Sequence, residues 1–170
     1  MIDIVQQIIQ LQTTTQTPIT KNDLQITDTS LLEKKWEVFV TFYKSGNIVW
    51  SAGNIVTLES DLVNELILST LEALKNIPKN DYSQLQIRVD VLQKREVLKT
   101  KTLSDLNPTQ VWVIAIKRSN DKLAVILPNI SPNITSGVEL KKALELKLQE
   151  NFVEENYILY EFTTQSFTSF

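Results

Sequence analysis

The stretch Trp36-Glu37-Val38-Phe39-Val40-Thr41-Phe42-Tyr43 decides the fold class of this chain. It is β-branched and aromatic almost throughout, which is typical of a strand. Ser45-Gly46-Asn47 follows, and Gly and Asn tolerate the positive φ that tight hairpin turns require. A second apolar run extends from Ile48 to Thr57. We therefore expect residues 36–44 and 48–57 to pair as neighbouring antiparallel strands.

The segments on either side of this hairpin mix helical and strand patterns. Helical apolar spacing predicts a helix over residues 2–11, and residues 12–35 read as an irregular connector. Ser60 is expected to cap a second helix. From residue 85, apolar residues alternate with Gln86, Arg88 and Asp90, which predicts a half-buried strand with a solvated face.

The last third of the chain continues the mixture. Residues 111–117 and 123–127 are expected to form a second hairpin. Ser136 and Glu139 fit a capping box that opens a helix, and residues 157–163 supply a last strand. Because hairpin connections dominate, we predict an α+β fold on a largely antiparallel sheet. A chain of 170 residues can bury one sizeable core, so a single domain over residues 1–170 is expected.

The composition excludes several kinds of chemistry, because the chain contains no cysteine and no histidine. A Ser-His-Asp or Cys-His mechanism, a zinc finger and a His-rich catalytic metal site cannot be assembled from the remaining side chains. Only carboxylates, lysines, tyrosines and hydroxyls are left for chemistry. We therefore expect no catalytic residue, no transition-metal site and no cofactor.

Charge and hydropathy bear on nucleic-acid binding, on membrane insertion and on cellular location. The net charge is −3 and the basic residues are dispersed, so duplex nucleic acid is not expected as a partner. No run approaches 18 uninterrupted apolar residues, so no membrane span is expected. The first residues lack the basic and apolar regions of a signal peptide. A cytoplasmic protein is the prediction.

The order of several short motifs resembles the AMMECR domain family. The first is the hairpin segment with Phe39-Val40-Thr41, Lys44, Gly46 and Gly53. Downstream, the family's Ser-Val-Ser-Val-Leu…Glu strand resembles residues 88–92 with Glu96. The resemblance continues with Leu127-Pro128, Lys147 and the closing strand Tyr160 to Thr164. It covers nearly the whole chain and implies an AMMECR-like α+β domain.

The chain departs from this family at the signature Leu-Arg-Gly-Cys-Ile-Gly. The equivalent stretch is Ile48-Val49-Trp50-Ser51-Ala52-Gly53, which keeps only the first apolar residue and the last glycine. The arginine and the thiol of the family motif are both lost. A serine is a poor nucleophile without an activating base. We therefore expect this chain not to carry any reaction that the family's motif supports.

The altered motif and one loop supply the candidate ligand- or partner-binding residues. Ser51, Gly53 and Asn54 could let a ligand approach the backbone, although a glycine bulge that shapes a sheet edge is the more common explanation. Trp50 could anchor a partner, although aromatic residues in strands are more often core. Asn129 at a loop tip could donate a hydrogen bond to a ligand.

Three functions compete at this point. The loss of the arginine and cysteine of the family signature, and the absence of histidine, favour a non-catalytic binding or scaffold module with a protein partner. A small-molecule ligand stays open. The alternative is an enzyme or enzyme subunit in cofactor or nucleobase modification, a role that the resemblance implies and that hydroxyls and carboxylates would have to perform. A single-strand nucleic-acid binder is the third, and the negative net charge weighs against it.

Overall fold

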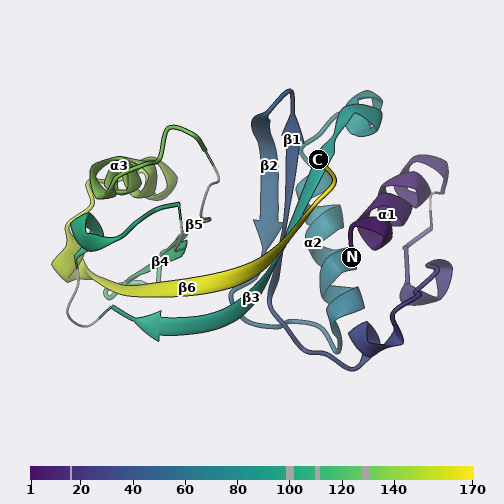
Figure 1. Ribbon diagram of the computed structural model, residues 1–170, viewed down its shortest axis with the longest axis horizontal. Coiled ribbons are helices and arrows are strands. Elements are labelled where there is room, and N and C mark those ends of the chain that lie inside the picture. Colours follow the sequence, from purple (N-terminus) through teal and green to yellow (C-terminus); the bar gives the residue numbers. More distant parts are fainter. Residues whose placement is uncertain (16, 99–101, 110–111, 128–130) are drawn as a thin grey trace. The chain divides into compact units, whose positions relative to one another are not determined.

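The computed structural model describes residues 1–15, 17–98, 102–109, 112–127 and 131–170 (Figure 1). Its α-helices are α1 (Ile2–Thr14), α2 (Leu62–Leu74) and α3 (Gly137–Leu148). Its strands are β1 (Val38–Lys44), β2 (Asn47–Gly53), β3 (Gln86–Val97), β4 (Trp112–Lys117), β5 (Leu123–Ile126) and β6 (Tyr157–Thr168). Hydrogen bonds join these strands in the order β2-β1-β3-β6-β4-β5. The predicted α+β fold with a largely antiparallel sheet is confirmed.

The first hairpin has the predicted pairing. β1 and β2 are antiparallel, with Thr41 opposite Ser51 and Lys44 opposite Asn47. Ser45 and Gly46 form the two-residue loop, and their φ values of 52° and 77° match a type I′ turn. β2 ends at Gly53, earlier than the predicted end at Thr57.

Contacts divide the described chain into two compact units. One contains residues 1–92 and 165–170, and the other contains residues 93–164. Each unit has its own cluster of buried apolar side chains. The single domain expected over residues 1–170 stays a prediction.

The core of the first unit lies between one face of β1 and β3 and the two N-terminal helices. α2 packs on β1 and β2, and α1 packs on α2 (Figure 1). Alternate strand residues face this core, because side chains of a strand point to opposite faces in turn. They include Val38, Val40, Phe42, Ile87, Val89 and Val91.

The connector between α1 and β1 is more ordered than the sequence indicates. α1 continues to Thr14, so the predicted start of the connector at residue 12 is wrong. The hydroxyls of Thr13 and Thr14 bond back to the Gln10 carbonyl and support this last turn. Two 3-10 turns follow, and Leu24 and Leu31 are buried in the core.

α2 begins one residue later than predicted, because Asp61 and not Ser60 is the N-cap. The Asp61 carboxylate accepts the Asn64 N–H at 3.0 Å, and Lys21 Nζ lies 3.2 Å from its other oxygen. Burial opposes ionisation of this carboxyl. Hydrogen bonds from Asn64, Ser60 and Lys21 outweigh burial and hold the pKa of Asp61 below its ordinary value.

Glu65, one turn further along α2, is fully buried. Its Oε1 accepts the backbone N–H groups of Leu58 and Glu59, the latter at 2.7 Å. Within the described chain its Oε2 has no hydrogen-bond partner, nor have the hydroxyls of Ser69 and Thr70. Glu65 therefore ties the segment that follows β2 to the helix.

The second unit has the predicted hairpin of β4 and β5, with Val113 opposite Ile126, and β6 pairs with β4 on the other side. α3 packs on β5 and begins with the predicted capping box of Ser136 and Glu139. β6 extends to Thr168, beyond the predicted end at residue 163.

A cluster of polar side chains joins the end of α3 to the strands of this unit. Glu150 accepts hydrogen bonds from Lys117 Nζ at 2.7 Å and from the Tyr157 hydroxyl. Burial and the Glu150 carboxylate raise the pKa of Tyr157 to about 12. The phenol therefore stays protonated well above neutral pH.

None of the helices in the described ranges is long and apolar enough to cross a membrane.

Replacement of Glu65 by alanine should lower the free energy of unfolding by about 2–4 kcal/mol, because two backbone N–H groups lose the buried carboxylate that accepts them. Glu65→Gln keeps an acceptor oxygen for these two N–H groups. Its stability should stay within about 1 kcal/mol of the parent protein. Urea unfolding measures both variants.

Glu72→Ala is the matched control, because Glu72 lies on the same helix with an exposed side chain paired to Lys75. Its loss should stay below about 0.5 kcal/mol. Equal losses in Glu65→Ala and Glu72→Ala would contradict the role given to Glu65.

The raised pKa of Tyr157 predicts a pH dependence at the alkaline end. The folded-state value of about 12 exceeds the ordinary value of 10.0. The stabilisation from protonated Tyr157 should therefore be complete below pH 10 and disappear as pH rises towards 12. Ultraviolet titration of phenolate should lose its highest-pH component in Tyr157→Phe. A titration curve that keeps this component in the variant would show the assignment to be wrong.

Candidate functional site

The candidate site is the face of β1, β2 and β3 that points away from the first unit's core. Strand register places Ser51, Thr41 and Arg88 in one row across the three strands. The next row on the same face contains Gly53, Phe39 and Asp90. The sheet therefore brings together polar residues from three separate stretches of sequence.

Arg88 and Asp90 are buried, so the predicted solvated face of this strand is wrong. Their exposed fractions are 8% and 0%. Arg88 Nε lies 2.9 Å from Asp90 Oδ2, and Nη2 donates to Oδ1 at 3.0 Å. A buried charge requires a partner, and this bidentate pair supplies it. Alternation of polar and apolar residues shows which face a side chain occupies, and whether that face is covered depends on the tertiary structure.

Ser166, near the end of β6, completes this ion pair. Its hydroxyl donates to the Asp90 carboxylate and accepts from Arg88 Nη2 at 3.4 Å. A residue 76 positions away in the sequence thus closes the network around Asp90. The arrangement is that of a satisfied polar network, in which the carboxylate is already engaged.

Ser51 lies beside this network but lacks an activating base. Its hydroxyl is 2.9 Å from that of Thr41, which is fully buried. In the described part of the chain, neither hydroxyl bonds to a carboxylate or an amine. A serine needs such a base to become a nucleophile. The pair therefore links β1 to β2.

Tyr43, opposite Gln86, is a further titratable group on this face. Burial raises the pKa of its phenol, and the neighbouring Arg88 lowers it by a smaller amount, so the net shift is upward. Its ring meets that of Phe170 edge to face, with centroids 5.6 Å apart. The phenol is protonated at neutral pH and does not act as a base.

Trp50 lies opposite Phe42, a core residue, and so on the other face from Ser51 and Gly53. The predicted binding residues are therefore divided between two faces of β2. The Trp50 side chain is 44% exposed and Ile48 is 38% exposed. Val56 and Leu58, which follow β2, are also exposed. Trp50 thus lies outside the core and at the edge of the sheet.

Gly53 is explained by the packing of β2 on β1. A Cβ at this position would lie 2.3 Å from the Val38 carbonyl oxygen and 2.7 Å from the Phe39 Cα. The irregularity in strand register lies elsewhere, opposite Phe42 and Tyr43. Asn54 follows and is half-buried. The candidate Asn129 lies outside the described residues.

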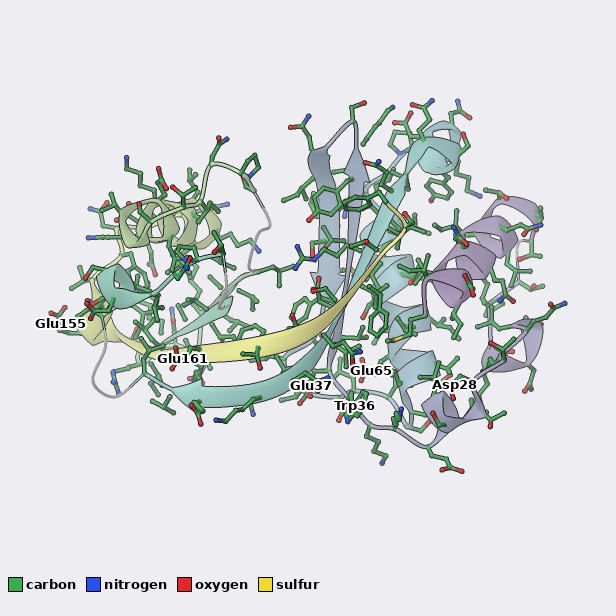
Figure 2. The ribbon with its side chains drawn as sticks, in the orientation of Figure 1. Asp28, Trp36, Glu37, Glu65, Glu155 and Glu161 are labelled. Atoms are coloured by element: carbon green, nitrogen blue, oxygen red, sulfur yellow. The ribbon has the colours of Figure 1, made fainter. Side chains whose placement is uncertain are left out.

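A cavity of about 480 Å³ in the first unit was missed by sequence reasoning. Its walls come from α1, the connector, the residues before β1 and the end of β6. Figure 2 labels two of its residues, Asp28 in the connector and Trp36 just before β1. Since a tertiary meeting of four segments forms the cavity, no single motif marks it. An aromatic residue just ahead of a strand was the one local signal.

The described residues contain no group of three or more carboxylates, histidines or cysteines placed to hold a metal ion.

Comparison with known proteins supports the fold and no activity. The structure is similar to that of the uncharacterized protein PH0010 from Pyrococcus horikoshii, with a TM-score of 0.74 and 16% sequence identity. The match covers 97% of this chain and 87% of the other. No protein-family model and no curated protein sequence matches this chain.

The buried ion pair predicts strong coupling between its two members. Arg88→Met or Asp90→Val alone leaves a buried charge unpaired, and each should cost about 3–5 kcal/mol of folding stability. The double variant should lose less than the sum of the two, by at least about 2 kcal/mol. Denaturant unfolding of the four proteins measures this coupling.

The exposed pair Lys94–Glu96 is a matched control, because it has the same spacing on the same strand. Its cycle of Lys94→Met and Glu96→Val should give a coupling below about 1 kcal/mol. Comparable coupling in the two cycles would refute the importance of burial for Arg88 and Asp90.

Proposed function

We propose that this chain is a divergent AMMECR-like protein that acts as a non-catalytic binding module. In this proposal a protein partner adds an extended segment to the edge of β2, and Trp50 is the anchor. The ordered motifs that resemble the family, together with the α+β fold, support the first part. The exposed and uncharged edge of β2 supports the second.

The two ends of the sheet differ in how their edges are protected. β5 ends the strand order on one side, and Lys147 Nζ donates to its Val125 carbonyl at 2.6 Å. Lys147 belongs to α3, and a helix that covers an edge strand discourages its pairing with another chain. β2 ends the strand order on the other side, and its sequence from Asn47 to Gly53 contains no charge. Addition of a strand at β2 would satisfy the outer row of its backbone groups.

Trp50 is the observation that carries the proposal. Tryptophan is enriched among the residues that dominate binding energy at protein interfaces. Here a large apolar ring is 44% exposed on an edge strand, with Ile48 exposed nearby. Valine at position 49 and tryptophan at position 50 also replace the arginine and glycine of the family signature. The change exchanges an ionic group for an apolar contact surface.

The proposal of a non-catalytic role is supported by the hydrogen bonds that already engage the polar groups of this face. Asp90 is engaged by Arg88 and Ser166, and the Ser51 hydroxyl faces that of Thr41. Arg88 and Asp90 stand where the resembling family strand has two serines. Because Arg88 and Asp90 bond to each other, fewer of their polar atoms are available to a ligand than two serine hydroxyls would offer.

The second candidate is an enzyme or enzyme subunit that modifies a cofactor or nucleobase through hydroxyls and carboxylates. The row of Ser51, Thr41 and Arg88 is the observation that favours it, because it places a guanidinium on the same sheet face as a serine. A small-molecule substrate would have to displace the internal partners of these groups.

Trp50→Ala should weaken partner binding at least tenfold, equivalent to about 1.4 kcal/mol, while folding stability changes by less than about 1 kcal/mol. A partner found by co-purification would be produced separately, and its affinity measured by calorimetry. Leu123→Ala is the matched control, since Leu123 is also 44% exposed and lies on the opposite edge strand, β5. Its effect on affinity should stay below about twofold.

Two results would overturn the proposal. The first is unchanged affinity of the purified partner for Trp50→Ala. The second is a measurable turnover that disappears in Ser51→Ala without loss of folding, which would establish the enzyme instead.

A further inference from the structure

The cavity of about 480 Å³ in the first unit has the size and lining of a small-molecule site. Ligand pockets commonly measure about 300–1,000 Å³ and combine an apolar surface with a few polar groups. Ile4, Leu31 and Phe167 supply apolar surface. Polar groups come from side chains of α1, the connector and the end of β6, including Asp3, Gln7, Thr27, Asp28 and Gln165.

Two hydrogen bonds fix one wall of this cavity. The Gln7 side chain accepts the Gln25 N–H at 2.7 Å and donates to the Gln25 carbonyl at 3.2 Å. Leu31 anchors the same connector in the core. Because the wall is held before any ligand arrives, little ordering cost opposes binding.

Lys34 shows which kind of group the cavity attracts. Its ammonium lies 4.8 Å from the centroid of the Trp36 ring, and both residues line the cavity. A cation above an indole face is attracted by the quadrupole of the ring. Lys34 therefore occupies this position as an alkylammonium group tethered to the protein.

Carboxylates in the lining can face a ligand cation. Asp3 and Asp28 contribute two carboxylates, and the positive charges that act on Asp28 are the ammonium of Lys34 and the N-terminal ammonium of Met1. Asp28 Oδ1 accepts both the N–H and the hydroxyl of Ser30, at 3.1 and 2.7 Å. The hydroxyl bond is the main reason that the pKa of Asp28 lies below its ordinary value. Its carboxylate is thus held in place and ionised at neutral pH.

We propose that this cavity binds a small alkylamine, whose ammonium takes the place of Lys34 above Trp36 while Asp28 faces the positive charge. The aliphatic body of the ligand lies against Ile4, Leu31 and Phe167, and the side-chain amide of Gln165 borders it. Lys34 competes with the ligand for the Trp36 ring, and this competition lowers the observed affinity of the ligand. The proposal is independent of strand addition at β2, which uses none of these residues.

The test uses 1,5-diaminopentane as the probe and 1,5-pentanediol as its uncharged counterpart. Binding to the full chain is followed by NMR chemical shifts of the Trp36 indole N–H and of the Gln7 and Gln165 side-chain amides. The diamine should give a saturable shift at these three groups. The diol at equal concentration should give none.

Three variants separate this site from general attraction of cations to a negatively charged protein. Lys34→Met removes the tethered competitor and should tighten diamine binding about fivefold. Lys35→Met removes the same charge from an exposed neighbour and should change affinity by less than about twofold. Asp28 is the N-cap of the 3-10 turn Thr29–Leu32. Asp28→Asn keeps a good N-cap residue and should weaken binding about fivefold.

The proposal fails if the diol shifts the same groups, or if Lys34→Met and Lys35→Met tighten binding equally. It also fails if neither the parent protein nor Lys34→Met gives a saturable shift with the diamine. Trp36→Leu adds a further check, because loss of binding with retained folding is expected. Should Trp36→Leu unfold, the comparison of Asp28→Asn with Lys35→Met still decides the question.

Discussion

Complete burial of β1 is the constraint on which the first unit depends. All residues from Val38 to Tyr43 are buried, and the strand is paired with β2 on one edge and β3 on the other. One face packs on helices through apolar side chains. The other face carries Thr41 and the neighbouring Arg88 and Asp90, which water cannot satisfy. Their hydrogen bonds must therefore come from protein groups, among them Ser51, Ser166 and Tyr43, and the need for Ser166 fixes the position of the C-terminal end of β6.

The elements that local rules determine were predictable from the sequence. The β1–β2 hairpin follows from strand propensity on both sides of Ser45-Gly46, and the start of α3 follows from the Ser136–Glu139 capping box. Element boundaries shifted where a second interaction intervened. Asp61 became the cap of α2 because it also binds Lys21, 40 residues away, which no local pattern records. The same limit explains Arg88 and Asp90, whose alternation with apolar residues is identical for a covered and an uncovered face.

The candidate site was predictable only in part. The sequence directed attention to the stretch from Trp50 to Asn54, but it did not show that Trp50 and Ser51 occupy opposite faces with different surroundings. The cavity beside Trp36 could not be predicted, because its walls come from four segments between residues 1 and 167. Those segments converge through packing of Leu31 and Phe167 on the core and through the Gln7–Gln25 hydrogen bonds. Such convergence is a property of the fold as a whole.

The close contact at Gly53 limits what this glycine can indicate about function. Any side chain there would collide with the backbone of β1, so substitution is forbidden by sterics whatever the protein does. A glycine at this position would survive a complete change of role. Its presence therefore reflects the packing of β2 on β1 and carries no information about activity. Evidence about function has to come instead from a neighbour such as Trp50, whose side chain is partly exposed.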